Sequence, residues 1–89
     1  MAKRDYIIAY DIRDKKRLRE ISKIMEKNSL RIQRSVYFCE NISKRELNGI
    51  IDRVLPILKK SDDLRGYTIK DRGFALGDGV DLNSAYILI

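Results

Sequence analysis

The sequence predicts an α+β protein, an antiparallel sheet with two helices packed on one of its faces. Two observations lead to this prediction. Strand-like and helix-like patterns follow one another as strand, helix, strand material, helix, strand, with a further strand-like stretch at the end. The chain has 89 residues, the size of one domain. Residues 1–89 are therefore expected to form a single ferredoxin-like βαββαβ sandwich with an extra C-terminal strand.

The first strand is predicted over residues 6–12, where apolar, β-branched and aromatic types dominate. Because apolar and polar residues do not alternate here, both faces of the strand should be covered, as at the centre of a sheet. The helices can cover only one face, so we expect a homodimer formed through the other face. Asp11 lies at the carboxyl end of this strand. Burial of its charge would be costly without a cation, a metal or a hydrogen-bond donor.

A helix should follow this strand at once. Asp14 is a suitable N-cap, and the helical pattern fades over residues 27–29. Apolar side chains recur at helical spacing at Leu18, Ile21, Ile24 and Met25. The first turns are basic, with Lys15, Lys16, Arg17 and Arg19. Since the helix dipole favours anions there, this departure from local preference indicates a functional site that holds phosphates beside Asp11.

Residues 30–39 are rich in β-forming types and predict either one long strand kinked near Ser35 or two short strands in succession. Alternation places Ile32, Val36 and Phe38 on one face, with Arg31 and Gln33 opposite. Good phosphate donors gather in this stretch, at Arg31, Gln33, Arg34 and Ser35.

A second helix is predicted after a capping box formed by Ser43 and Glu46, and Pro56 should kink or end it. The two acids that follow, at positions 62 and 63, are expected to be turn or capping groups rather than a catalytic pair. Residues 64–70 predict another strand region. Residues 74–76 and 85–89 predict short strands, and the segment 73–89 is a candidate for pairing with a partner subunit.

Composition narrows the function. The chain has 19 Lys and Arg against 13 Asp and Glu, a net charge of +6 that favours nucleic acid as a partner before an anionic membrane. Histidine is absent, which excludes Ser-His-Asp and Cys-His catalysis and His-ligated metals. Cys39 is the only cysteine, which fits a reducing, cytoplasmic setting. No apolar segment approaches the roughly 20 residues that span a bilayer, so no membrane association is expected.

Four segments in order resemble the CRISPR-associated Cas2 family. Tyr-Asp-Ile at residues 10–12 closes the first strand, and residues 14–19 begin the basic helix. Residues 31–37 resemble the Gln-x-Ser-Val-aromatic strand of the family, and residues 62–69 resemble its strand after the second helix. The resemblance covers most of residues 5–70.

The resemblance implies a ferredoxin-like homodimer of the adaptation stage, in which new spacers are acquired together with an integrase. It implies that Asp11 is the catalytic residue and the ligand of a divalent metal, usually Mg²⁺, with one such acid in each subunit. Family members are described as metal-dependent endonucleases on RNA or DNA and as bridges that hold duplex DNA for the integrase. The expected nucleic-acid-binding residues are Arg13, Arg17, Arg19, Arg31, Arg34 and Ser35, supported by Tyr10 and Gln33.

Other interpretations stay open on the residues alone. The basic residues can hold a duplex backbone without cleaving it, which would make the chain a non-catalytic adaptor in the integrase complex. Asp11 would then be a metal or packing residue whose chemistry is dispensable. For Asp11 itself, the alternative to a metal ligand is a structural acid paired with an arginine. An RNA-binding module of the same fold is disfavoured, because no strand carries the Lys/Arg-Gly-aromatic-Gly-aromatic pattern.

Overall fold

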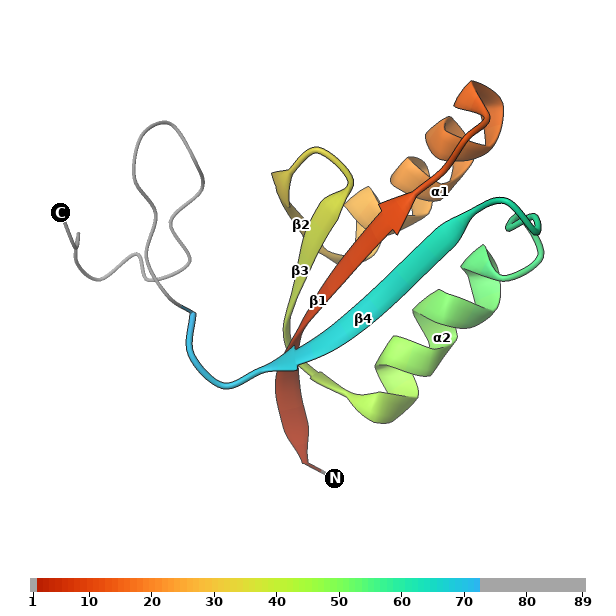
Figure 1. The fold of residues 1–89 in the computed structure, drawn as a ribbon. Coiled ribbons are helices and arrows are strands. Elements are labelled where there is room, and N and C mark those ends of the chain that lie inside the picture. The colour runs from red at the N-terminus through yellow and green to blue at the C-terminus, as the bar shows by residue number, and fades with distance from the viewer. Residues whose placement is uncertain (1, 73–89) are drawn as a thin grey trace, which may run out of the picture.

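The computed structural model describes residues 2–72, which form a four-stranded sheet and two helices (Figure 1). The elements are β1 (Lys3–Asp11), α1 (Lys15–Asn28), β2 (Leu30–Gln33), β3 (Val36–Ser43), α2 (Lys44–Val54) and β4 (Asp63–Ile69). The predicted order is confirmed, and residues 30–39 are two strands rather than one. The strands predicted at 74–76 and 85–89, and the pairing of 73–89 with a partner, lie outside the described residues.

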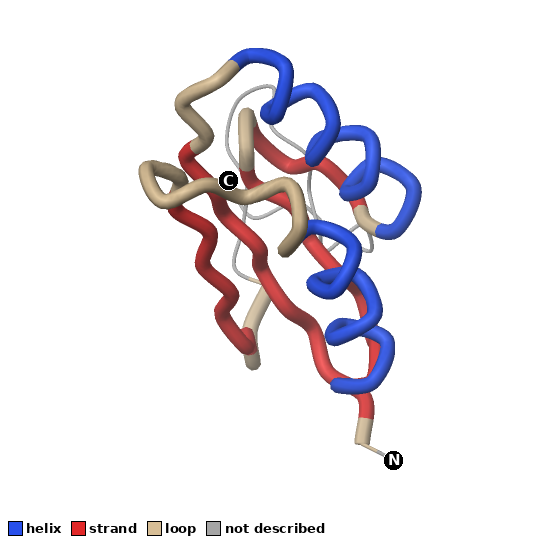
Figure 2. Tube along the Cα trace, turned by 90° about the vertical axis from the view of Figure 1, so that its right-hand side faces the viewer, coloured by secondary structure: helices blue, strands red, loops and turns tan. Residues whose placement is uncertain are grey.

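The sheet has the strand order β2-β3-β1-β4, and every neighbouring pair is antiparallel. This is the ferredoxin-like arrangement that the sequence predicts, with β1 at an interior position. Figure 2 shows both helices on the same side of the sheet. Neither described helix is long and apolar enough to cross a membrane.

The core lies between the helices and one face of the sheet. From β1, Ile8 and Tyr10 point into it, because alternate residues of a strand face the same side. Ile12, just after β1, also belongs to this cluster. The helices and β3 contribute its remaining buried side chains, which are Ile21, Met25, Tyr37, Cys39, Ile50 and Val54. The helical spacing of Leu18, Ile21, Ile24 and Met25 therefore identifies the face of α1 that packs on the core.

The opposite face of the sheet carries neither helix (Figure 2). Ile7 pairs with Phe38 and Tyr67, and Phe38 pairs with Leu30, so these four residues form one apolar row across the sheet. Leu30 and Tyr67 are 48% and 52% exposed. On the same face, Asp11 is exposed. Within one chain Ile7 and Ala9 are partly buried and Phe38 is buried on this face, and the further cover that the sequence predicts from a second copy stays a prediction.

The β2–β3 hairpin turns through Arg34 and Ser35, and Ser35 has a φ of 60°, in the left-handed region. Arg31 pairs with Tyr37 on the helix-covered face, but Gln33 pairs with Val36. The expectation that Gln33 faces away from Val36 is therefore wrong. An irregularity between Arg31 and Gln33 shifts the register, which moves a side chain to the other face.

Candidate nucleic-acid and metal site

The carboxyl end of β1 meets segments from three other parts of the chain. The backbone N–H of Tyr10 donates to the carbonyl of Ser35 in the hairpin turn at 3.1 Å. Asp11 is the register partner of Asp63, the first residue of β4. Residues 12–14 connect Asp11 directly to α1. This end of the sheet therefore brings together most of the residues that the sequence singles out.

A groove of about 380 Å³ lies between α1 and the β2–β3 hairpin. Its cationic side chains are Lys15, Arg19, Arg31 and Arg34, and its hydroxyl-bearing ones are Ser22, Ser35 and Tyr37. None of these four cations is in an ion pair within residues 2–72. Because arginine and lysine without acidic partners are strong phosphate donors, this basic groove suits a polyanionic strand.

Two stacked tyrosines support the groove from the core side. The rings of Tyr10 and Tyr37 lie 5.9 Å apart at 16°, and the Tyr10 hydroxyl is 2.9 Å from Oγ of Ser22. Burial raises the pKa of Tyr10, although the hydrogen bond with Ser22 partly lowers it. Tyr10 therefore stays a neutral phenol that holds Ser22 and Tyr37, both residues of the groove wall.

Asp11 differs from the buried acid that the sequence predicts. Its side chain is exposed and makes no hydrogen bond or ion pair with residues 2–72. The alternative of a structural Asp–Arg pair at this position therefore has no partner in the described part of the chain. Its neighbour across the sheet, Asp63, is held by Nε of Arg65 at 2.9 Å.

The described residues supply one ligand of a divalent metal site, the Asp11 carboxylate, but not a complete set of ligands. Asp11 offers the carboxylate oxygen that Mg²⁺ prefers. Within residues 2–72, however, no three acidic, histidine or cysteine side chains gather closely enough to hold a metal ion. A complete site therefore needs ligands from outside this set.

Arg17 does not line the basic groove. Its Nε and Nη2 donate to the two carboxylate oxygens of Asp62 at 2.9 and 3.0 Å. The Asp62 side chain is fully buried and also accepts from the backbone N–H groups of Arg13 and Lys59 at 3.2 and 3.0 Å. The Arg17 guanidinium holds the pKa of Asp62 well below its usual range. The expectation that both acids are turn or capping groups is confirmed for Asp62, which bonds to Lys59 in the turn before β4, and is wrong for Asp63, which is the first residue of β4.

The predicted binding residues thus divide by position. Arg19, Arg31, Arg34 and Ser35 line the basic groove together, whereas Arg13, Arg17 and Gln33 do not. Two wall residues, Lys15 and Ser22, are absent from the set predicted to bind nucleic acid. Their signal was available, since positions 15, 19 and 22 follow helical spacing on one face of α1.

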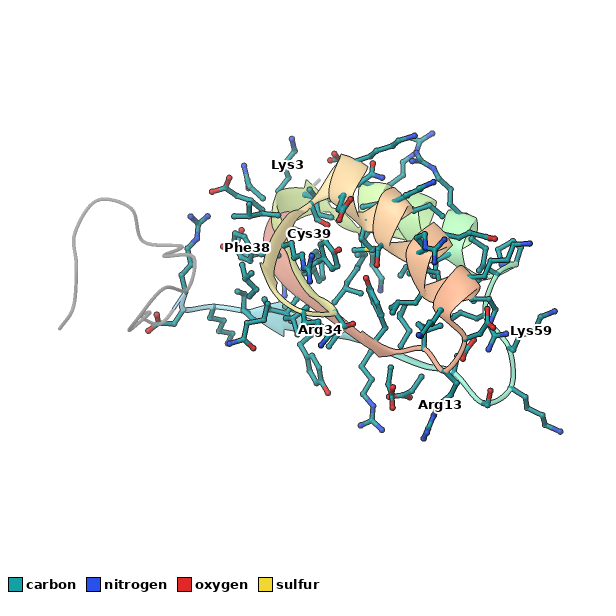
Figure 3. All side chains as sticks on the ribbon, turned by 90° about the horizontal axis from the view of Figure 1, so that it is seen from above. Lys3, Arg13, Arg34, Phe38, Cys39 and Lys59 are labelled. Atoms are coloured by element: carbon teal, nitrogen blue, oxygen red, sulfur yellow. The ribbon has the colours of Figure 1, made fainter. Side chains whose placement is uncertain are left out.

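A larger hollow than the basic groove lies elsewhere on the molecule. It measures about 770 Å³ and lies around Lys3, Lys70 and Arg72 at the other end of β1. Figure 3 shows Lys3 and Arg13 on opposite sides of the molecule. Arg72 there is bound to Asp5 and Glu40 at 3.1 and 2.9 Å, so part of the positive charge is already neutralised. The smaller basic groove is the better anion site.

Fold and site define a small ferredoxin-like α+β protein with a basic groove near the end of β1, whose last residue, Asp11, is exposed on the sheet face away from the helices. The family model described as CRISPR associated protein Cas2 matches residues 4–75, and the chain belongs to this family. The predicted family resemblance is confirmed.

Similar proteins agree with this assignment. A relative from Synechocystis, named CRISPR-associated endoribonuclease Cas2 2, is 31% identical over 67 residues, which cover 73% of this chain and 71% of the relative. The crystal structure of a hypothetical protein from Thermus thermophilus has a TM-score of 0.80 at 32% identity, covering 88% of this chain and 95% of that one. Streptococcus pyogenes Cas2 has a TM-score of 0.71 at 28% identity, covering 82% and 99%.

Proposed function

We propose that this protein is a metal-dependent endonuclease of the CRISPR adaptation stage that cleaves phosphodiester bonds, in RNA before DNA. The observation that carries the proposal is the position of the basic groove. Its unpaired cations adjoin the strand end at which Asp11 offers a carboxylate with no other partner in the described chain. The name of the Synechocystis relative, an endoribonuclease, supports RNA as the substrate.

The groove would hold the backbone of the substrate. Arg19, Arg31 and Arg34 would donate to phosphate oxygens, and the Ser35 hydroxyl would add a further hydrogen bond. These donors contact phosphates rather than base edges, so binding should depend steeply on salt and little on base sequence.

Asp11 would hold the divalent metal, for which Mg²⁺ is the expected ion. When bound, such an ion supplies a polarised water and offsets charge on the scissile phosphate. Since the chain has no histidine, no imidazole is available as a general base. The role of the protein's own side chains would be to hold the ion and the phosphate together.

A second copy of the chain would complete the metal site. Asp11 lies on the same face as the apolar row of Leu30, Phe38, Ile7 and Tyr67, since alternate strand residues share a face. A partner that covers this row in a twofold dimer would bring its own Asp11 towards the first. Dimer formation through the open sheet face is therefore part of the proposal.

One observation favours a second candidate, the non-catalytic adaptor that holds duplex DNA for the integrase. Carboxylate ligation at Asp11 is sparse, because the described residues supply no group of three metal ligands. In this case the basic groove would bind a duplex and Asp11 would be dispensable. Co-purification with the cognate integrase at low salt supports this candidate, and its failure counts against it.

The deciding experiment compares wild type with Asp11→Asn on labelled RNA and duplex DNA, with Mg²⁺ or with EDTA. The matched control is Glu26→Gln, which removes one exposed carboxylate from the far half of α1. We expect Asp11→Asn to lower the cleavage rate by roughly 100-fold or more, with binding retained and the control active.

Three other outcomes contradict the nuclease. Equal cleavage by wild type and Asp11→Asn would point to a contaminant, and cleavage that survives EDTA would exclude a metal requirement. Binding by both proteins with cleavage by neither would leave the adaptor as the function.

A further inference from the structure

We infer that Arg17 is a positioning residue and not a phosphate ligand, and that with Asp62 it fixes the loop between Asp11 and α1. The inference rests on the proposed function, because it concerns how the same site is arranged. It assigns Arg17 a role different from that of the neighbouring basic residues Lys15 and Arg19, which line the basic groove.

The guanidinium of Arg17 is already bound to a carboxylate of the same chain. Its Nε and Nη2 bind both oxygens of Asp62 at 2.9 and 3.0 Å, the paired arrangement for which arginine is suited. The Asp62 side chain is fully buried. If Arg17 turned towards a phosphate, it would leave that buried charge unpaired, which is strongly unfavourable.

The same carboxylate ties together segments that are far apart in sequence. It accepts from the backbone N–H of Arg13, two residues after Asp11, and from that of Lys59, in the connection between α2 and β4. Asp14, between Arg13 and Arg17, caps α1 by accepting from the Arg17 N–H at 3.0 Å. The Arg17–Asp62 pair thus anchors the short loop that joins Asp11 to the helix.

This anchor has a consequence for the site. The first turns of α1 carry Lys15 and Arg19 in the groove wall, and the loop before α1 follows directly on Asp11, the last residue of β1. The position of the start of α1 relative to the end of β1 therefore sets the positions of Lys15 and Arg19 relative to the Asp11 carboxylate. Arg17 acts on the bound strand through this arrangement, without touching it.

The salt dependence of binding distinguishes the two roles. The probe is a fluorescein-labelled RNA oligonucleotide, titrated with each variant over a range of salt concentrations well below the melting temperature of every variant. The slope of log K against log salt is negative, and removing one phosphate ligand reduces its magnitude by about 0.7 for a single strand. We expect that decrease for Arg19→Gln and Arg31→Gln, the matched controls from the groove.

For Arg17→Gln we expect an unchanged slope together with an affinity loss of roughly tenfold, the scale on which groups that orient a ligand act. Asp62→Asn should weaken binding similarly, although it makes the protein more positive, and the double variant should be no worse than either single one. Arg17→Lys should lose affinity like Arg17→Gln, because it keeps the charge but not the paired geometry. This variant keeps the test decisive if Asp62→Asn does not fold.

Other results overturn the inference. One is a salt slope whose magnitude is reduced by about 0.7 in Arg17→Gln. Another is wild-type affinity in Arg17→Lys. A third is tighter binding by Asp62→Asn, which is expected if the substitution releases Arg17 to bind a phosphate. In each case the wild type still binds, so the proposed function survives. Absence of salt-dependent binding by the wild type itself would instead contradict the proposed function, and this inference with it.

Discussion

Asp62 illustrates how a side chain with no part in the chemistry can determine where the chemical groups lie. It joins the start of α1 to the turn before β4 through four accepted hydrogen bonds. The sequence predicted that Asp62 is a turn group, and this was possible because its partner Lys59 is only three residues away in sequence. It did not indicate Arg17 as a partner of Asp62, because an ion pair across 45 positions has no local signature.

The Arg17–Asp62 pair should make stability depend on pH. Arg17 lowers the pKa of Asp62 in the folded chain. The stabilisation is therefore present above the unfolded-state pKa of about 3.9 and is lost as the pH falls towards the lower folded-state pKa. We expect Asp62→Asn to have a lower urea midpoint than wild type at pH 7, with the difference shrinking below about pH 4. Urea unfolding followed by circular dichroism across this range measures it.

The control for this measurement is Glu26→Gln, whose exposed side chain should leave the midpoint near that of wild type throughout. An offset between wild type and Asp62→Asn that stayed constant down to low pH would contradict the assignment, because it would mean that the carboxylate charge does not contribute.

At the scale of elements, both helices begin where the sequence predicts, because capping is a local interaction. The Ser43 hydroxyl accepts from the Glu46 N–H at 3.1 Å, and the Glu46 carboxylate accepts from the Ser43 N–H at 3.1 Å. The hydrogen bond that the Ser43 N–H donates to the Glu46 carboxylate lowers the pKa of Glu46, and the Ser43 side chain lowers it further. The strand register was harder to predict, since the irregularity at Arg31–Gln33 depends on pairing with β3.

Loss of the capping box should be measurable at the first turn of α2. We expect Ser43→Ala to destabilise the protein by about 1 kcal/mol, the usual cost of losing an N-cap hydroxyl. For a domain of this size that lowers the melting temperature by roughly 4–8 °C. Thermal unfolding by circular dichroism tests it, with Ser61→Ala, at an exposed loop serine, as the control. Equal melting temperatures for the two variants would contradict the capping role.

At the scale of the whole molecule, the strand and helix order was readable from periodicity, and the ferredoxin-like topology followed from that order. The exposure of the sheet face away from the helices could not be predicted from this order. The unbroken apolar run of β1 predicted cover on both faces, yet within one chain Leu30 and Tyr67 stay about half exposed and Asp11 is exposed. The cover that this pattern predicts on the second face therefore remains part of the proposed dimer. Four residues that line the basic groove could be predicted from the sequence as binding residues, but the sequence did not show which of the predicted residues would line it together.

The measurement that tests the central claim most directly is a titration of the protein with Mn²⁺, followed by electron paramagnetic resonance. Mn²⁺ takes the oxygen ligands that Mg²⁺ takes. The proposed dimer predicts one bound ion for every two chains in the wild type and in Glu26→Gln, and none at that site in Asp11→Asn. One ion for every chain, or binding unchanged in Asp11→Asn, would contradict a site built from the two Asp11 carboxylates.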